Sequence, residues 1–311
     1  MKVITTLRSL LDPKGEEQRV VAGIVCCIVA LFLFSSLDAT TKYLVHLYPI
    51  PMVAWVRYLA QFALMTAVLA PIMGRELLHT TRTALVLLRS SCLACVSLLL
   101  ITAFSRLPLA EATSLMFVAP LLVILLARPM LKERIGVVRW VAVLAGFVGV
   151  LVIARPSGRL DALGVALVLL ATLFNALYQL LSGVLRKTER APALLFYSAL
   201  LGTVVFGLAM PWFWGGPAST PLYYLLFIAM GVFGGLGHFL FTEAFHLAPA
   251  SLLAPIMYLQ LLISGFLGWW IFGQVPDHVT LFGMAIIAAS GIAVAIYGRG
   301  QTGMGAELAQ E

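Results

Sequence analysis

The amino-acid sequence predicts an all-α integral membrane protein whose ten transmembrane helices form two inverted five-helix repeats. Three observations predict this class: the composition, ten apolar runs, and a duplication with a period of about 140 residues. Of the 311 residues, 62% are hydrophobic and 11% are charged, and the mean hydropathy is +1.04. A soluble domain has about 25% charged and about 45–50% apolar residues, so this chain requires a lipid bilayer as its solvent.

The apolar runs are long enough to cross a membrane. A helix that spans the hydrocarbon core needs about 20 mostly apolar residues. Runs of this kind, separated by Pro, Gly and charged residues, predict spans at 20–43, 51–72, 84–105, 109–130, 136–154, 162–185, 192–213, 221–246, 250–272 and 278–297. Polar residues rather than a small-residue cleavage site follow the first run, so it is interpreted as a signal anchor.

Lysine and arginine are distributed unequally between the two sets of loops. With the N-terminus inside, fourteen fall in cytoplasmic segments: Lys2, Arg8, Lys14, Arg19, Arg75, Arg82, Arg128, Lys132, Arg134, Arg139, Arg186, Lys187, Arg190 and Arg299. Three fall in outer loops: Arg106, Arg155 and Arg159. Because positive charge resists translocation, this bias predicts cytoplasmic termini and, with the short loops, a bacterial inner-membrane protein. The net charge of +7 therefore needs no nucleic-acid partner.

A duplication is visible in the prolines. Ala-Phe, Pro and Met of AFSRLPLAEATSLM (103–116) recur with the same spacing in AFHLAPASLLAPIM (244–257), and Pro51 recurs as Pro192 in the same register. The repeats are predicted at 20–154 and 162–297, flanked by cytoplasmic segments 1–19 and 298–311. Five is an odd number of helices, so the second copy enters the membrane upside down. Inverted repeats are typical of secondary transporters, whose substrate site lies near the bilayer midplane.

Several motifs carry a family resemblance. FSSLDATTKYL (34–44), PMVAWVR (51–57) and the punctuation of 103–153 by Pro108, Pro120, Glu133 and Gly146 resemble EamA-type transporters of the drug/metabolite transporter superfamily. The second copy departs from the pattern, because Gln274 stands where the first has Glu133. The resemblance covers about residues 20 to 297. It implies ten helices, inverted repeats and export of small metabolites or drugs, with similarity to bacterial amino-acid exporters, including aromatic amino-acid and methyl viologen exporters.

Two predicted spans carry a stripe of polar side chains on one helical face. In the span 20–43 the stripe contains Ser35, Asp38, Thr41 and Lys42. In the span 162–185 it contains Asn175, Tyr178, Gln179 and Ser182. The repeat aligns Ser35 with Asn175 and Asp38 with Tyr178. We therefore expect the two stripes to line a shared cavity from opposite sides.

Other interpretations of these residues remain open. The stripes can instead form hydrogen bonds between helices, and Asp38 and Lys42 can form an i, i+4 ion pair with Lys42 reaching toward the headgroups. Arg57 can pair with Asp38, meet a substrate carboxylate, or anchor the outer interface. His238 suits either a proton relay or simple packing.

The predicted site collects polar and aromatic residues from several spans. The substrate-binding residues are predicted to be Ser35, Asp38, Arg57, Gln61, Ser97, Asn175, Tyr178, Gln179, His238, Thr242, Tyr258 and Gln260. Candidates for proton coupling are Asp38, His238 and Glu243. The cysteines, including the Cys92–Cys95 pair, are assigned to helix packing, so no metal site and no cofactor is expected.

The sequence lacks the motifs of metalloproteases, of hydrolases and of ATP-driven pumps, and an intramembrane enzyme is only a third alternative. The sequence contains no H-E-x-x-H, G-x-S-x-G or Walker A motif, so it predicts a protein that is not an enzyme. We expect a monomeric or homodimeric secondary transporter that exports small organic metabolites, either amino acids (aromatic ones included) or drug-like cations, by alternating access. The alternatives are a passive channel or facilitator, and a transporter of nucleotide-like or vitamin substrates.

Overall fold

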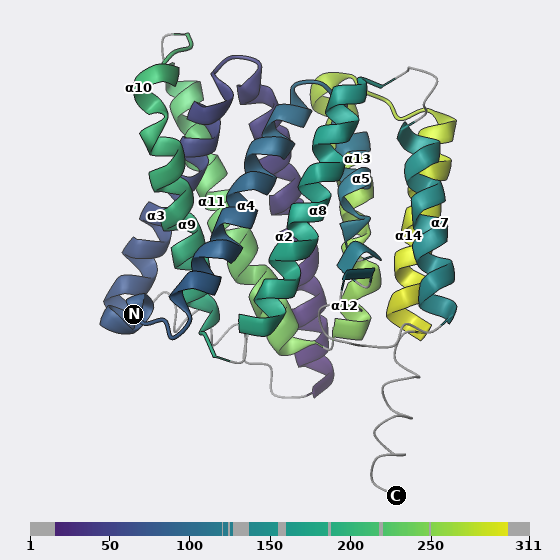
Figure 1. Cartoon of the computed structure of the whole chain (residues 1–311), viewed down its shortest axis with the longest axis horizontal. Coiled ribbons are helices and arrows are strands. Elements are labelled where there is room, and N and C mark those ends of the chain that lie inside the picture. The colour runs from purple at the N-terminus through teal and green to yellow at the C-terminus, as the bar shows by residue number, and fades with distance from the viewer. Residues whose placement is uncertain are drawn as a thin grey trace, which may run out of the picture.

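A computed structural model describes residues 16–119, 121–123, 125–126, 137–154, 160–185, 188–217, 220–248 and 250–297. Every regular element in these ranges is helical (Figure 1). The helices are α2 (Glu16–Val45), α3 (Ile50–Met73), η1 (Gly74–Leu78), α4 (Thr83–Phe104), α5 (Leu109–Met116), α7 (Val137–Ala154), α8 (Ala162–Leu185), α9 (Ala191–Leu208), α10 (Met210–Phe213), α11 (Pro221–Leu247), α12 (Ala250–Met257), α13 (Leu259–Phe272) and α14 (His278–Tyr297). The predicted all-α class is confirmed.

Six of these helices are long and apolar enough to cross a membrane: α2, α3, α4, α8, α9 and α11. Their outer faces carry large apolar side chains in the open, such as Leu208 at 70% exposure and Ile228 at 61%. Such a surface is stable in lipid but not in water. Three of these six helices have proline in the first turn: Pro51 in α3, Pro192 in α9 and Pro221 in α11. Proline is tolerated there because the first N–H groups of a helix have no intrahelical acceptor.

Two predicted spans are interrupted rather than continuous. The predicted span 109–130 breaks after α5 at Phe117, and 250–272 breaks between α12 and α13 at Tyr258; residues 127–130 lie outside the described ranges. At the first break the Phe117 N–H bonds the Ser114 carbonyl at 3.1 Å, which tightens the last turn. The two breaks occupy equivalent positions in the repeat, and their rings meet at 5.2 Å between centroids. Interrupted helices inside a bundle are typical of transporters.

The predicted span 192–213 is also divided, at Ala209 between α9 and α10. Pro211 follows two residues later, and its ring cannot continue an uninterrupted helix.

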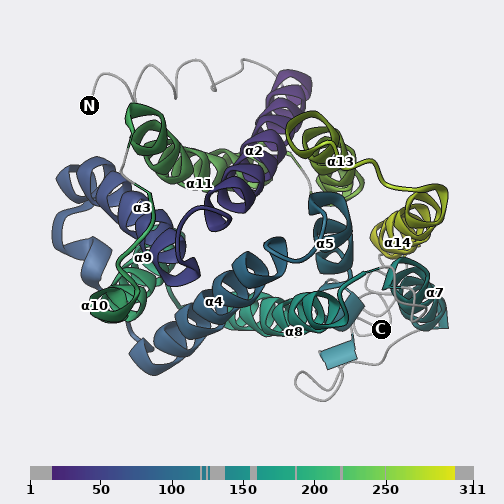
Figure 2. The same cartoon turned by 90° about the horizontal axis from the view of Figure 1, so that it is seen from above.

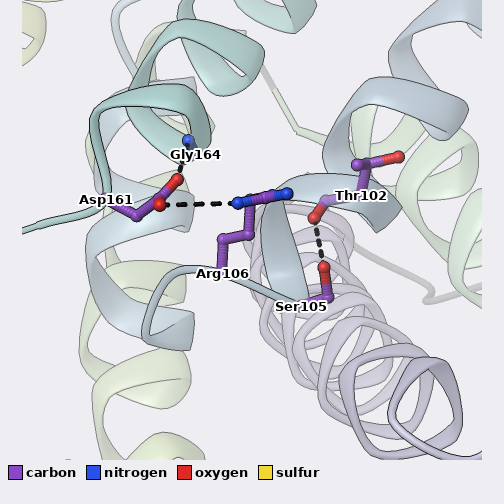
Figure 3. Close-up of polar contacts among 5 residues, drawn as sticks. All are labelled: Thr102, Ser105, Arg106, Asp161 and Gly164. Carbon is purple, nitrogen blue, oxygen red and sulfur yellow. Dashed lines mark hydrogen bonds and ion pairs between the residues drawn. The ribbon is translucent and has the colours of Figure 1, made fainter.

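Contacts between helix ends define two rims of the bundle. The upper rim of Figure 1 contains residues 46–49, 105–108, 160–161 and 214–217. There Arg106 Nη1 lies 3.4 Å from Asp161 Oδ2 (Figure 3), and the Tyr48 hydroxyl donates to the Pro217 carbonyl at 3.4 Å. The lower rim contains residues 74–82 and 188–190, where Arg190 pairs with Glu76.

These rims give the direction of each long helix. Helix α2 ends at the upper rim, whereas α8 begins there, so the two run in opposite directions. The same reversal separates α3 from α9 and α4 from α11. Equivalent helices also pack on equivalent partners (Figure 2). Helix α2 packs along α11, and its counterpart α8 packs along α4, the counterpart of α11. Helix α3 packs on its own counterpart α9, and α7 packs on α14. The largest buried apolar cluster surrounds α5 and joins both copies, through residues such as Phe104, Leu115 and Leu261.

On the lower rim, a carboxylate from the second copy holds the start of α4. Glu189 Oε1 accepts hydrogen bonds from the Thr81 hydroxyl at 2.6 Å, the Thr81 N–H at 2.9 Å and the Arg82 N–H at 2.8 Å. Burial by itself would raise the pKa of Glu189, but these donors together hold that pKa below its usual value. The charged carboxylate therefore caps the α4 N-terminus, where negative charge is favoured.

The close contact between α3 and α9 requires glycine at position 202. A Cβ atom there would lie 2.3 Å from Cδ1 of Tyr58, a ring that is buried and fixed by its hydroxyl contact to Ser97 at 2.7 Å. We predict that Gly202→Ala lowers the free energy of unfolding by about 1–3 kcal/mol, because the overpacked helices must separate. The measurement is thermal unfolding of the purified protein in detergent.

The matched control is Gly183→Ala in α8, where an added Cβ meets no atom within 4 Å. Alanine favours a helix over glycine by about 1 kcal/mol, so this variant should be as stable as the parent or more so. Equal destabilisation by both variants would contradict the assigned α3–α9 contact.

Candidate functional site

Ionisable residues from three helices lie near one another in the interior. They are Asp38 of α2, Arg57 of α3 and His238 of α11, and the charge of Arg57 interacts with both of the others. All three side chains are half-buried. In the described part of the chain, the Asp38 carboxylate has neither a hydrogen bond nor an ion pair.

Aromatic and amide groups border these charges. The Phe34 ring meets the His238 ring edge-on at 4.9 Å between centroids. Gln61 is buried, and its Oε1 faces Gly234 of α11. The Thr242 hydroxyl donates to the His238 carbonyl at 2.8 Å within the same helix. Ser35 lies one turn from Asp38 and its hydroxyl accepts from Ser264 of α13 at 3.2 Å, which fixes that part of α2.

Lys42 does not pair with Asp38 and does not reach the headgroups. Its Nζ donates to the Phe104 carbonyl at 2.7 Å and to the Leu107 carbonyl at 2.5 Å, and the side chain is only 2% exposed. The last carbonyls of a helix have no intrahelical donor and carry partial negative charge. Lys42 therefore caps the end of α4 and ties α2 to it.

Arg89 of α4 forms the most extensive polar contact between the two copies, which we call the polar clamp. Its guanidinium donates to Ser182 Oγ at 2.7 Å, the Tyr178 hydroxyl at 2.7 Å, Ser198 Oγ at 2.9 Å and the Leu194 carbonyl at 3.1 Å. These acceptors come from α8 and α9, and Arg89 is 4% exposed. The guanidinium also lies 4.3 Å from the Tyr178 ring centroid. The clamp satisfies a buried cation with neutral acceptors alone.

The polar stripe of α8 is therefore divided between two roles. Tyr178 and Ser182 serve Arg89 in hydrogen bonds between helices. Asn175 and Gln179 are half-buried, and neither side chain has a hydrogen bond to any described residue. Helix α4 lies between α2 and α8 in Figure 2 and packs against both of them.

The remaining predicted residues have separate contacts of their own. Ser97 shares a hydrogen bond with the Tyr58 hydroxyl at 2.7 Å. The Tyr258 hydroxyl points at Gly291 of α14, where a Cβ atom would overlap it. Gln260, two residues beyond the break in α13, and Glu243 of α11 are half-buried.

Sequence reasoning did not assign Arg89 or the capping role of Lys42. Arg89 lies within an apolar span rather than in a loop, and this position is itself a signal, because an intramembrane cation must find partners. Its partners come from helices that are distant in sequence, α8 and α9 of the second copy. No local motif can identify them.

Comparisons with known proteins place this geometry in a family. The model of the EamA-like transporter family matches residues 21–155 and again residues 162–296. This chain belongs to the EamA-like transporter family. The two matches account for nearly the whole length, so the EamA-like chain contains two copies of the family repeat.

Relatives of this EamA-like protein have several substrates in their names. An S-adenosylmethionine uptake transporter of Rickettsia bellii is 32% identical over 85% of this chain and 90% of its own. A riboflavin transporter of Rhizobium johnstonii is 27% identical, covering 89% and 92% of the two chains. A pseudopaline exporter of Pseudomonas aeruginosa is 26% identical, covering 88% and 95%. A solved crystal structure with 16% identity aligns with a TM-score of 0.65 over 90% of this chain and 98% of that chain, which shows the fold alone.

The family and the apolar helices together establish the general activity. This EamA-like protein is a multi-pass transporter of the inner membrane that acts on small molecules. The names of its family and relatives are those of transporters rather than enzymes. The predicted membrane location and family are confirmed.

The polar clamp should contribute strongly to stability. Hydrogen bonds between membrane helices contribute about 0.6–2 kcal/mol each, so Tyr178→Phe should lower the free energy of unfolding by that amount. Arg89→Gln removes the guanidinium that holds four acceptors and should lower it by several times more. Thermal unfolding of the transporter in detergent measures both.

The control is Arg82→Gln, which removes the same charge from an exposed side chain on the lower rim. It should change stability by no more than about 0.5 kcal/mol. If Arg89→Gln were as stable as Arg82→Gln, the clamp would not hold the helices together.

Proposed function

We propose that this transporter is a secondary carrier that binds a small zwitterionic metabolite between Asp38 and Arg57 and moves it by alternating access. The observation that carries the proposal is the Asp38 carboxylate, which is half-buried inside a membrane span and has no hydrogen bond or ion pair to a described residue. Fold stability gains nothing from such a group, since buried polar groups without partners are costly. A substrate cation would supply the missing partner.

The proposed membrane topology has ten crossings. It adds four shorter apolar segments to the six long helices: Leu109–Val123, Trp140–Ala154, Leu259–Phe272 and His278–Ala293. We propose that the lower rim is cytoplasmic, because positive residues such as Arg82 and Arg190 gather there and both termini are predicted on that side. The opposite directions of equivalent helices support an inverted pair of repeats at 20–154 and 162–297.

The substrate class follows from the charges and rings of the site. The S-adenosylmethionine in the name of the Rickettsia bellii relative combines an amino acid, a sulfonium cation and a flat adenine. A cation would lie against Asp38, a carboxylate would bind the guanidinium fork of Arg57, and a ring would pack near Phe34. We therefore propose that the substrate is an amino-acid derivative that also carries a cation and a flat ring. Such a molecule combines the predicted amino-acid substrate with the nucleotide-like alternative.

The direction of transport is proposed to follow the substrate gradient. Relatives are named for uptake as well as export, and two inverted repeats can exchange inward and outward conformations. Export of amino acids remains a prediction from the sequence. Asp38, His238 and Glu243 remain the proposed groups for any proton coupling.

We predict that Asp38→Asn strongly impairs counterflow of radiolabelled S-adenosylmethionine in proteoliposomes. A hydrogen bond to a charged group is worth about 1.5–3 kcal/mol, or about 10- to 150-fold in substrate affinity. The parent protein should show saturable counterflow, which a passive channel does not.

Asp161→Asn is the matched control, because it neutralises an exposed carboxylate on the upper rim. It should transport like the parent. Unchanged counterflow by folded Asp38→Asn would remove Asp38 from the mechanism. Saturable transport of riboflavin or a simple amino acid, but not of S-adenosylmethionine, would overturn the substrate class alone.

We also predict that the substrate path reaches Asn175 and Gln179. In a cysteine-free background, Asn175→Cys and Gln179→Cys should react with a membrane-impermeant maleimide, because a polar lining is wetted. Leu173→Cys, at a position 39% exposed on the same helix, should react only with a lipid-soluble reagent. If all three behave like Leu173→Cys, the α8 stripe is packing.

A further inference from the structure

The six long helices are not held to their neighbours in the same way. Five of them have a side-chain hydrogen bond to another long helix or to the end of one. Lys42 ties α2 to the end of α4, and the Tyr58 hydroxyl ties α3 to α4 through Ser97. The polar clamp of Arg89 ties α4 to both α8 and α9.

Helix α11 is the exception. In the described ranges, no side chain of α11 forms a hydrogen bond or ion pair with another helix, and its Thr242 bonds only the α11 backbone. Yet α11 packs along α2 and α3 over most of its length. Among the described residues, this contact is therefore held by packing rather than by side-chain hydrogen bonds.

Glycines form the surface of α11 that meets α2 and α3; we call Gly231, Gly234, Gly235 and Gly237 the glycine face. A Cβ at Gly231 would lie 2.4 Å from Cβ of Ala60 in α3. One at Gly237 would lie 2.8 Å from Cε1 of Phe34 and 3.5 Å from Cβ of Leu33, both in α2. Such a face has no side-chain ridges to lock its position along the helix axis. Dispersion contacts are non-directional and survive a small axial shift, whereas hydrogen bonds do not.

The repeat makes this difference specific to α11. Helix α4 is its counterpart, and the register that aligns Ala103 with Ala244 also aligns Arg89 and Ser90 with Met230 and Gly231. The first copy thus has its polar clamp where the second begins its glycine face. Ser90 Oγ adds a contact to Ser198 Oγ at 3.2 Å, while Met230 is buried in an apolar cluster. Among the described residues, one of two equivalent interfaces is therefore joined by side-chain hydrogen bonds, whereas the other is joined by packing without them.

We propose that α11 is the moving element of the transport cycle. It slides along α2 and α3, while α2, α3, α4, α8 and α9 stay together through their hydrogen bonds. The proposal rests on the proposed function of alternating access, and it replaces a symmetric rocking of two halves with a shear at one interface. Because His238 lies on α11 while Asp38 and Arg57 lie on α2 and α3, the shift changes the site itself.

Disulfide cross-links can test which interface must move. In a cysteine-free background, Leu33→Cys with Gly237→Cys joins α2 to α11 at a Cβ separation of 3.5 Å, within the range that a disulfide spans. Ser90→Cys with Ser198→Cys joins α4 to α9. Oxidation of the first pair should reduce S-adenosylmethionine counterflow at least tenfold, with recovery on reduction. Oxidation of the second should leave counterflow within twofold of its reduced form.

Each reduced double variant is its own folding control. Loss of counterflow on oxidation of Ser90→Cys/Ser198→Cys would overturn the proposal, because the clamped interface would then have to move. Full counterflow by oxidised Leu33→Cys/Gly237→Cys would overturn it equally, because the α2–α11 contact would then be static.

A second measurement needs no substrate and keeps the glycine face intact. Leu33→Cys with Phe241→Cys places the thiols one helical turn out of register, as does Ser90→Cys with Leu194→Cys at the clamp. Sliding should make the first pair oxidise at least tenfold faster than the second, and equal rates would overturn the proposal. If the parent fails to transport S-adenosylmethionine while the rates differ as expected, the substrate assignment fails and the moving helix stands.

Discussion

The absence of water in the hydrocarbon layer is the constraint on which the rest of this structure depends. A polar group there must find its partner within the protein. Arg89 and Lys42 show how strictly this holds, since each is nearly fully buried and donates to acceptors on other helices. Side chains that are expensive in isolation thereby fix which helices stay together. The polar clamp and the α4 cap are consequences of the solvent as much as of the fold.

The same constraint makes Asp38 stand out. Lys42, one turn away on α2, is satisfied by two carbonyls, whereas the Asp38 carboxylate has no such partner among the described residues. In the proposed function, this carboxylate beside Arg57 and an aromatic ring receives a partner that arrives from outside. We propose that this partner is the transported molecule. On helix α2, Lys42 therefore stabilises the fold, whereas Asp38 is the residue proposed to bind the substrate.

Duplication gave two copies the same helix order, and divergence then gave them different contacts. Equivalent helices still pack on equivalent partners, and the two helix breaks still meet at Phe117 and Tyr258. Arg89 of α4 and Gly231 of α11, however, lie at nearly equivalent positions of the repeat and form different contacts: Arg89 forms hydrogen bonds, whereas Gly231 allows close packing. Hydrogen bonds resist displacement because they depend on direction and distance, whereas a glycine surface permits close approach without interlocking. A carrier needs both properties, one to preserve the fold and one to change its conformation.

The sequence by itself determined the solvent, the family, the repeat and most helix bounds, since these depend on composition and local period; the predicted span 162–185 coincides with α8. It also indicated Asp38 and Arg57 as candidate site residues, because a charge in an apolar run is visible from the sequence. The breaks at Phe117 and Tyr258 were missed, since apolar residues continue through both. Only the tertiary structure decided that Lys42 caps α4, that Tyr178 serves Arg89 and that α11 has no polar tie among the described residues. Those outcomes depend on distances between helices far apart in the chain, which no local pattern encodes.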